Sequence, residues 1–137
     1  MKERYLVKMP THITLSMVRV PDKKISLSLN WYRNAHHQQS NRVKKRYCQL
    51  AGRQIKKLPE MDVVELEFIY YSQKGKPTDI DNWCSVSNKF FQDCLVYHGK
   101  IKEDNYKFIK KIMYTYGGPS ETGKGYINIF IEGMNGQ

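Results

Sequence analysis

Two carboxylates stand close together in a short polar segment of the sequence. Asp79 and Asp81 lie in KGKPTDIDNW, residues 74–83. Because Pro77 favours an extended backbone for its neighbours, side chains at positions i and i+2 there point to the same side. The two carboxylates would repel one another unless a hard cation such as Mg²⁺ or Mn²⁺ lay between them. The pair indicates a metal site, although capping of the following helix would explain one of the two acids equally well.

The segment after the aspartates has the periodicity of a helix that ends near Gly99. Its apolar side is formed by Ile80, Trp83, Cys84, Ser87, Phe90, Phe91, Cys94 and Leu95. A polar stripe on the same helix starts at Asp81 and leads toward Lys89, which lies about 80° round the helix from it. The members of this stripe are Asp81, Ser85, Asn88 and Gln92.

An acidic turn follows this helix. Glu103 and Asp104 lie in KIKEDNYKF, just before a segment that alternates like a strand. A third carboxylate from this turn could complete the metal site, and Lys89 could neutralise a phosphate or a departing oxyanion. The alternative is a solvent-exposed acidic turn with a solvated lysine.

Positive charge is concentrated in the first part of the chain. The net charge is +10, and residues 1–59 carry 14 Lys and Arg against two acids, whereas residues 60–137 carry nine against eleven. Such asymmetry favours a surface that binds a polyanion, and nucleic acid is the commonest large polyanion in a cell. The surplus could also serve only solubility. The candidate DNA contacts are Arg42, Lys44, Lys45, Arg46, Arg53, Lys56, Lys57 and Lys76.

The length of 137 residues fits one compact domain, so we predict that residues 1–137 form a single α+β domain. Short strands are expected within 5–20 and 23–32, and a longer strand within 61–72. The basic segment predicts an amphipathic helix over 41–57 that starts at Ser40 or Asn41. Two late runs, NYKFIKKIMYTYG and GYINIFIEG, look like a hairpin. We therefore expect a mixed or antiparallel sheet with two main helices packed on it.

Several other functional classes are not supported. The segment GPSETGKG, 118–125, resembles a phosphate loop but has Gly125 where Ser or Thr is required, and it leads into a strand, so no nucleotide cofactor is expected. The adjacent His36 and His37 lack spaced metal-ligand partners. The apolar runs are too short for a membrane span and the N-terminus lacks an apolar signal core, which predicts a cytoplasmic protein.

The three cysteines are odd in number and widely spaced, which fits neither a disulfide framework nor paired zinc ligands. We therefore expect reduced thiols in the core at Cys48, Cys84 and Cys94.

The motifs around the aspartates resemble the RusA family of Holliday junction resolvases, especially forms carried by phages and prophages. DIDNW opens a helix, KFFQDCLVYHGKIKEDN and YKFIKKI follow it, and LSLNWYRNAHHQQSNRVKKRY precedes it, so the similarity covers roughly residues 26–115. The matching residues are Asp79, Asp81, Asn82, Lys89, Asp93, Leu95, Gly99, Ile101 and Asp104.

The resemblance implies a homodimeric, Mg²⁺-dependent endonuclease that cuts four-way DNA junctions symmetrically. Asp79, Asp81 and Asp104 would hold the metal, and a lysine would assist. The family's lysine stands four residues after the second aspartate, where this chain has Ser85, and the candidate Lys89 comes one helical turn later. Clustered carboxylates holding Mg²⁺ can supply an activated water and a stabilised leaving oxygen.

Two other functions are open from the residues. A module that binds junction or duplex DNA without cutting it would account for the basic first part of the chain and for the displaced lysine. A metal-dependent phosphatase or glycosyl-transfer enzyme would use the Asp-x-Asp motif but would not account for the positive charge.

Overall fold

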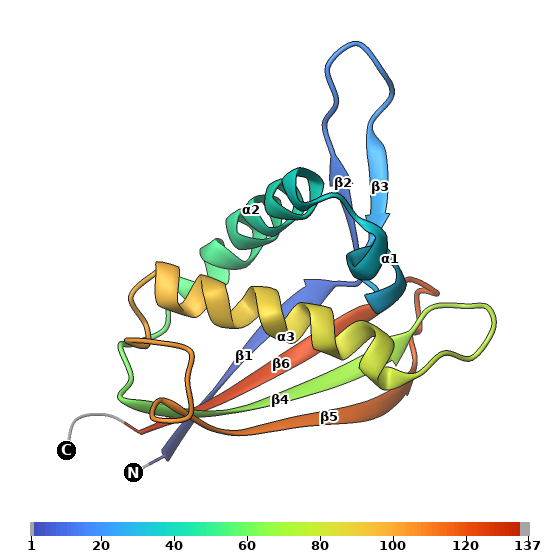
Figure 1. Ribbon diagram of the computed structural model, residues 1–137. Coiled ribbons are helices and arrows are strands. Elements are labelled where there is room, and N and C mark those ends of the chain that lie inside the picture. Colours follow the sequence, from blue (N-terminus) through green and yellow to red (C-terminus); the bar gives the residue numbers. More distant parts are fainter. Residues whose placement is uncertain (1, 135–137) are drawn as a thin grey trace.

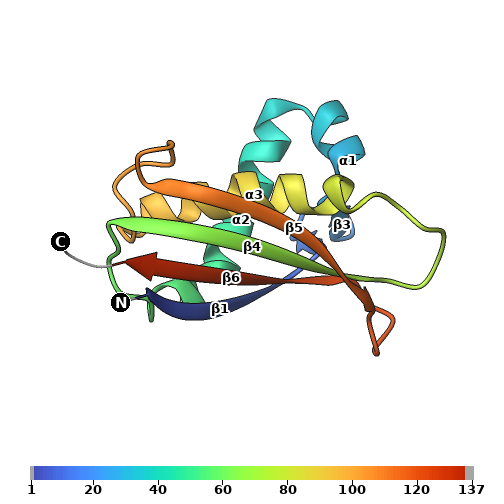
Figure 2. The same ribbon diagram turned by 90° about the horizontal axis from the view of Figure 1, so that it is seen from below.

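The computed structural model describes residues 2–134 as a single α+β domain of two layers (Figure 1). A four-stranded sheet forms one layer, and the helices cover one of its faces. Figure 2 shows the opposite face, where the strands lie in front of the helices. The elements are β1 Lys2–Pro10, β2 His12–Leu15, β3 Lys23–Ser26, α1 Leu29–Asn34, α2 His37–Ile55, β4 Val63–Ser72, α3 Ile80–Tyr97, β5 Ile109–Pro119 and β6 Tyr126–Met134.

The sheet is mixed, with strand order β1-β6-β4-β5. β4 and β5 are parallel and are connected through α3, whereas β6 is antiparallel to both β1 and β4. The predicted hairpin of the two last strands is therefore wrong, because β4 lies between β5 and β6. Alternation identified both segments as strands, but a period of two does not specify the partner of a strand.

The N-terminal region differs from the sequence-based expectation in two places. Residues 23–26 form a strand, but Leu29–Asn34 is a short helix whose N-cap Ser28 accepts a hydrogen bond through Oγ from the Trp31 N–H at 3.2 Å. Helix α2 begins four residues earlier than predicted, at His37, and His36 caps it instead of Ser40 or Asn41. β2 and β3 pair as a separate hairpin that projects from the body of the protein (Figure 1).

The core lies between the sheet and the two long helices. On β4, the alternate residues Val64, Leu66, Phe68 and Tyr70 are buried beneath the helices, as the predicted alternation requires. Tyr47 of α2 is fully buried, and its hydroxyl lies 3.0 Å from Ser87 Oγ of α3. Burial of each large apolar side chain contributes about 1.5–3 kcal/mol to the free energy of folding.

The cysteines form a link that the sequence did not predict. Cys48 of α2 and Cys94 of α3 form a disulfide across 46 residues of chain, so the expectation of three reduced thiols is wrong for these two. Cys84 is free and buried, as expected. Burial, and secondarily the charge of Asp81, raises the pKa of the Cys84 thiol to about 12, which keeps it in the thiol form at neutral pH.

Candidate active site and nucleic-acid interface

The aspartate pair lies at the start of α3. Asp79 is the N-cap residue, with an extended backbone, and Asp81 follows in the first turn. The Asp79 side chain makes no capping hydrogen bond, although its backbone oxygen accepts one from Asn82 N–H at 3.1 Å. Both side chains are exposed. Helix capping does not occupy the Asp79 carboxylate, so both acids are free to bind a ligand from solvent.

A polar row extends from Asp81 along the side of α3 that faces β5. Asn88 Nδ2 donates to the Tyr114 hydroxyl at 3.1 Å, and Gln92 Nε2 donates to Asn88 Oδ1 at 2.6 Å. Burial raises the pKa of the Tyr114 hydroxyl, the hydrogen bond with Asn88 lowers it in part, and the negative charge of Asp81 raises it further. Asn88 and Gln92 of the predicted polar stripe are thus hydrogen-bonded to each other, whereas Lys89, toward which the stripe was predicted to lead, is directed toward Tyr32.

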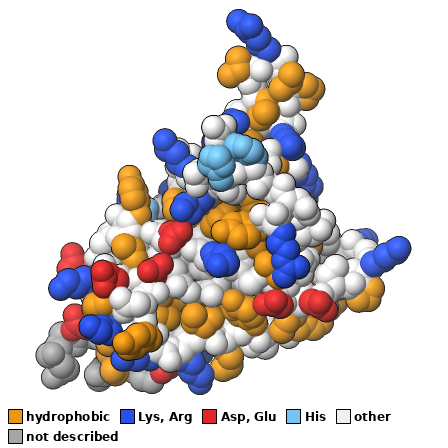
Figure 3. Space-filling model, viewed as in Figure 1, with side chains coloured by type: hydrophobic (Ala, Val, Ile, Leu, Met, Phe, Trp, Pro, Cys, Tyr) orange, Lys and Arg blue, Asp and Glu red, His pale blue; other side chains and the backbone are white. Residues whose placement is uncertain are grey.

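Asp104 lies at the other end of the helix. It follows the C-terminus of α3, which spans 18 residues and is therefore about 27 Å long. Figure 3 shows acidic side chains near both ends of α3 and not in one cluster. Within residues 2–134, no three His, Cys, Asp or Glu side chains gather to hold a metal ion. The expected site of Asp79, Asp81 and Asp104 is therefore not formed within one chain, because α3 separates the third acid from the pair.

Lys89 does not lie beside the aspartates. Its ammonium group lies 6.0 Å from the centroid of the Tyr32 ring of α1, so the side chain is directed toward α1 and away from the row that faces β5. It also follows Asp81 by eight residues, which is about 12 Å along the helix. Ser85 occupies the position of the family's lysine, and its hydroxyl donates to the backbone oxygen of Asp81 at 2.6 Å.

Most of the predicted DNA contacts lie on the exposed side of α2. Arg42, Lys45, Arg46 and Arg53 are exposed on α2, and Lys56 and Lys57 are exposed directly after its last residue, Ile55. Three of the α2 cations already have partners in this chain. Arg42 Nη2 donates to the backbone oxygen of Ser16 at 3.4 Å, Arg46 Nη1 donates to Gln49 Oε1 at 3.4 Å, and Lys44 Nζ forms an ion pair with Asp93 at 3.3 Å. Lys76 lies in the loop before the aspartates and lines a hollow of about 340 Å³ with Tyr70 and Tyr116.

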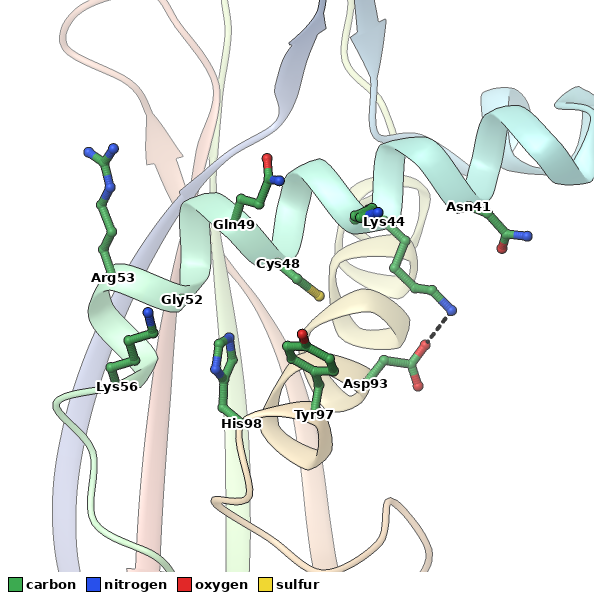
Figure 4. Close-up of a pocket in the computed structure, with 11 residues that line it drawn as sticks. Asn41, Lys44, Cys48, Gln49, Gly52, Arg53, Lys56, Asp93, Tyr97 and His98 are labelled. Carbon is green, nitrogen blue, oxygen red and sulfur yellow. Dashed lines mark hydrogen bonds and ion pairs between the residues drawn. The ribbon is translucent and has the colours of Figure 1, made fainter.

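A groove between α2 and α3 was missed by reasoning from the sequence. This α2–α3 groove has a volume of about 600 Å³ (Figure 4). It combines four of the predicted basic residues with Tyr97 and His98 from the end of α3. An aromatic residue off the apolar stripe of a helix is a signal that could have found Tyr97. The charged and aromatic lining consists of Lys44, Lys45, Arg53, Lys56, Tyr97 and His98.

Comparison with known proteins gives no identification: no protein-family model matches this chain, and no curated protein matches it. In the part of the chain that the structure describes, no helix is long and apolar enough to cross a membrane.

Proposed function

We propose that the protein is a Mg²⁺-dependent endodeoxyribonuclease that resolves four-way DNA junctions by phosphodiester hydrolysis. The observation that carries the proposal is the pair of exposed carboxylates at the start of α3, of which Asp79 makes no capping hydrogen bond with its side chain. The basic side of α2 and the resemblance of the surrounding motifs to RusA resolvases support it. The compartment that fits this activity is the cytoplasm of a bacterial cell, and the resemblance to phage and prophage forms fits a gene of phage or prophage origin.

The chemistry requires few protein ligands. Mg²⁺ is commonly held by one or two carboxylates together with substrate phosphates, so Asp79 and Asp81 would hold the ion against a DNA strand, and a third carboxylate would complete the site. When bound, the ion, or Mn²⁺ in its place, supplies an activated water and stabilises the leaving oxygen. Lys76 and the cations of α2 bind the other phosphates of the junction, which gives attachment without reading the base sequence.

In the proposed homodimer, a second copy supplies the third acid. β5 is an edge strand whose Ile112, Met113 and Tyr116 are exposed. Pairing of β5 with its copy about a twofold axis would make the two strands antiparallel. The α3 helices, which contact β5, would then also run antiparallel. Asp104 of one chain would thereby approach the Asp79 end of α3 in the other chain.

Cleavage of a synthetic four-way junction tests the proposal. We expect wild-type protein to cut in Mg²⁺, Asp81→Asn to lose cleavage while it still binds the junction in EDTA, and Asp62→Asn, an exposed acid elsewhere, to cut normally. Equal cleavage by wild type and Asp81→Asn would refute the catalytic assignment. Wild-type protein that binds junctions but never cuts in Mg²⁺ or Mn²⁺ would instead indicate a binding module. Turnover of a small phosphorylated substrate, without junction cleavage, would indicate a phosphatase.

Mixed dimers test whether the site is shared. Asp81→Asn and Asp104→Asn proteins should each be inactive. If each site combines the two chains, mixing the variants leaves one intact site per mixed dimer and restores part of the cleavage. If Asp104 acts within its own chain, or not at all, mixing restores nothing beyond the activity of the separate variants.

A further inference from the structure

The α2–α3 groove has three unpaired cations. Within residues 2–134, Lys45, Arg53 and Lys56 form no ion pair, whereas Lys44 is paired with Asp93 at one end of the groove. Figure 4 shows Arg53 and Lys56 on the last turns of α2, at the other end from that ion pair. The lining therefore keeps a positive surplus after its one acid is neutralised, and a strand of linked phosphates complements such a row of cations.

An aromatic ring projects into the same space. Tyr97 is 81% exposed, and both it and His98 extend from the end of α3 toward α2 (Figure 4). The two rings meet edge to face, with centroids 5.1 Å apart and planes at 84°, so neither ring lies flat on the other. An exposed tyrosine ring of this kind contributes little to the stability of the fold, whereas an exposed ring beside cations can stack on a nucleotide base.

His98 fixes the base of this arrangement. Its Nε2 is buried and has no hydrogen-bond partner among the described residues. The ring lies against Gly52 of α2, where an added Cβ would be only 3.0 Å from Nε2. Close packing of the imidazole on the helix backbone holds the end of α3, and with it Tyr97, beside the cations of α2.

We propose that the α2–α3 groove binds unpaired nucleotides of a DNA strand, with phosphates on Lys45, Arg53 and Lys56 and a base stacked on Tyr97. Cationic grooves with exposed aromatic rings suit single strands, because the faces of paired bases are covered within a duplex. The inference rests on the proposed function only in taking DNA as the polyanion. Tyr97 follows Asp81 by 16 residues, about 24 Å along α3, which corresponds to about seven nucleotides at duplex spacing.

Fluorescence anisotropy in EDTA tests the groove, with a labelled dT12 oligonucleotide and a 12-base-pair duplex as probes. Stacking on Tyr97 predicts that Tyr97→Ala weakens binding of dT12 by about 5- to 150-fold and leaves duplex binding unchanged, whereas Tyr97→Phe keeps both. Lys56→Ala should lower the slope of log K against log salt by about 0.7 for dT12. Lys124→Ala, an exposed lysine in the loop between β5 and β6, is the matched control and should change neither the affinity nor the slope.

Equal binding of dT12 by Tyr97→Ala and wild type would overturn the inference, as would equal weakening of dT12 and duplex binding. Thermal unfolding separates misfolding from lost stacking, because removal of an exposed ring should leave the melting temperature unchanged. The nuclease proposal fails separately. If Tyr97→Ala weakens dT12 binding but the wild type never cuts junctions, the groove proposal is supported and the nuclease proposal is refuted. If the wild type cuts junctions but Tyr97→Ala binds dT12 as tightly as wild type, the nuclease proposal is supported and the groove proposal is refuted.

Discussion

The disulfide between Cys48 and Cys94 should make a large contribution to stability. It joins α2 to α3 beneath the α2–α3 groove and closes a loop of 46 residues in sequence separation. In the chain-entropy account, a cross-link of this span removes about 13.5 cal/mol/K from the unfolded chain, which is about 4 kcal/mol at 25 °C. We therefore predict that Cys48→Ser lowers the free energy of unfolding by about 4 kcal/mol.

Urea unfolding of the oxidised protein measures this difference. For an m value of about 2 kcal/mol per M, the midpoint of Cys48→Ser should lie about 2 M below that of wild type. A reductant should lower the wild-type midpoint by a similar amount. It should leave the midpoint of Cys48→Ser unchanged, so the variant is the control for other effects of the reductant. Cytosolic thiols are mostly kept reduced, so the same comparison gives the stability of the protein in that environment.

Two results would refute this reasoning. A difference below about 1 kcal/mol between oxidised wild type and Cys48→Ser would show that the cross-link does not restrict the unfolded chain as the loop length requires. Titration of three free thiols in the unreduced, denatured protein would show that Cys48 and Cys94 are not joined.

Three further predictions concern residues that are buried or half-buried. Tyr47→Phe should lower the free energy of unfolding by about 1–3 kcal/mol, because it leaves the buried Ser87 hydroxyl without its hydrogen-bond partner. The double variant Tyr47→Phe/Ser87→Ala removes both hydroxyls and should lose less stability. A single-variant loss no larger than that of the double variant would contradict this reason. Burial, and secondarily Lys24, lowers the pKa of His12 from 6.5, so the unfolded chain binds the proton more readily and stability should fall as the pH drops below 6.5. His12→Gln should lose less stability between pH 7.5 and 5.5 than wild type, and equal losses would exclude His12 as the cause. Gly125→Ala should lower the melting temperature, because its Cβ would lie 2.6 Å from Thr11 Oγ1; an unchanged melting curve would show that Thr11 moves freely.

Local periodicity predicted most of the elements correctly. The alternation of β4 and the helical spacing of α3 are properties of consecutive residues, and both elements lie close to their predicted bounds. The polar row on α3 was predicted for the same reason. The position of Asp104 was open to the same reasoning, because Asp81 stands at the start of the predicted helix and Asp104 follows its end, so the length of the helix lies between them. The predicted metal site grouped the three aspartates by residue type and did not take into account the length of the helix between Asp81 and Asp104.

The sequence by itself determined the α+β class, the exposed aspartate pair at a helix start and the positive charge of α2, since each depends on residues near one another along the chain. Only the tertiary structure decided that β4 separates β5 from β6, that Cys48 meets Cys94, and that Tyr97 faces the cations of α2. These pairings join segments far apart in sequence. They arise because burial of apolar side chains between one sheet face and two helices fixes which surfaces meet, and no periodicity within a segment records its partner.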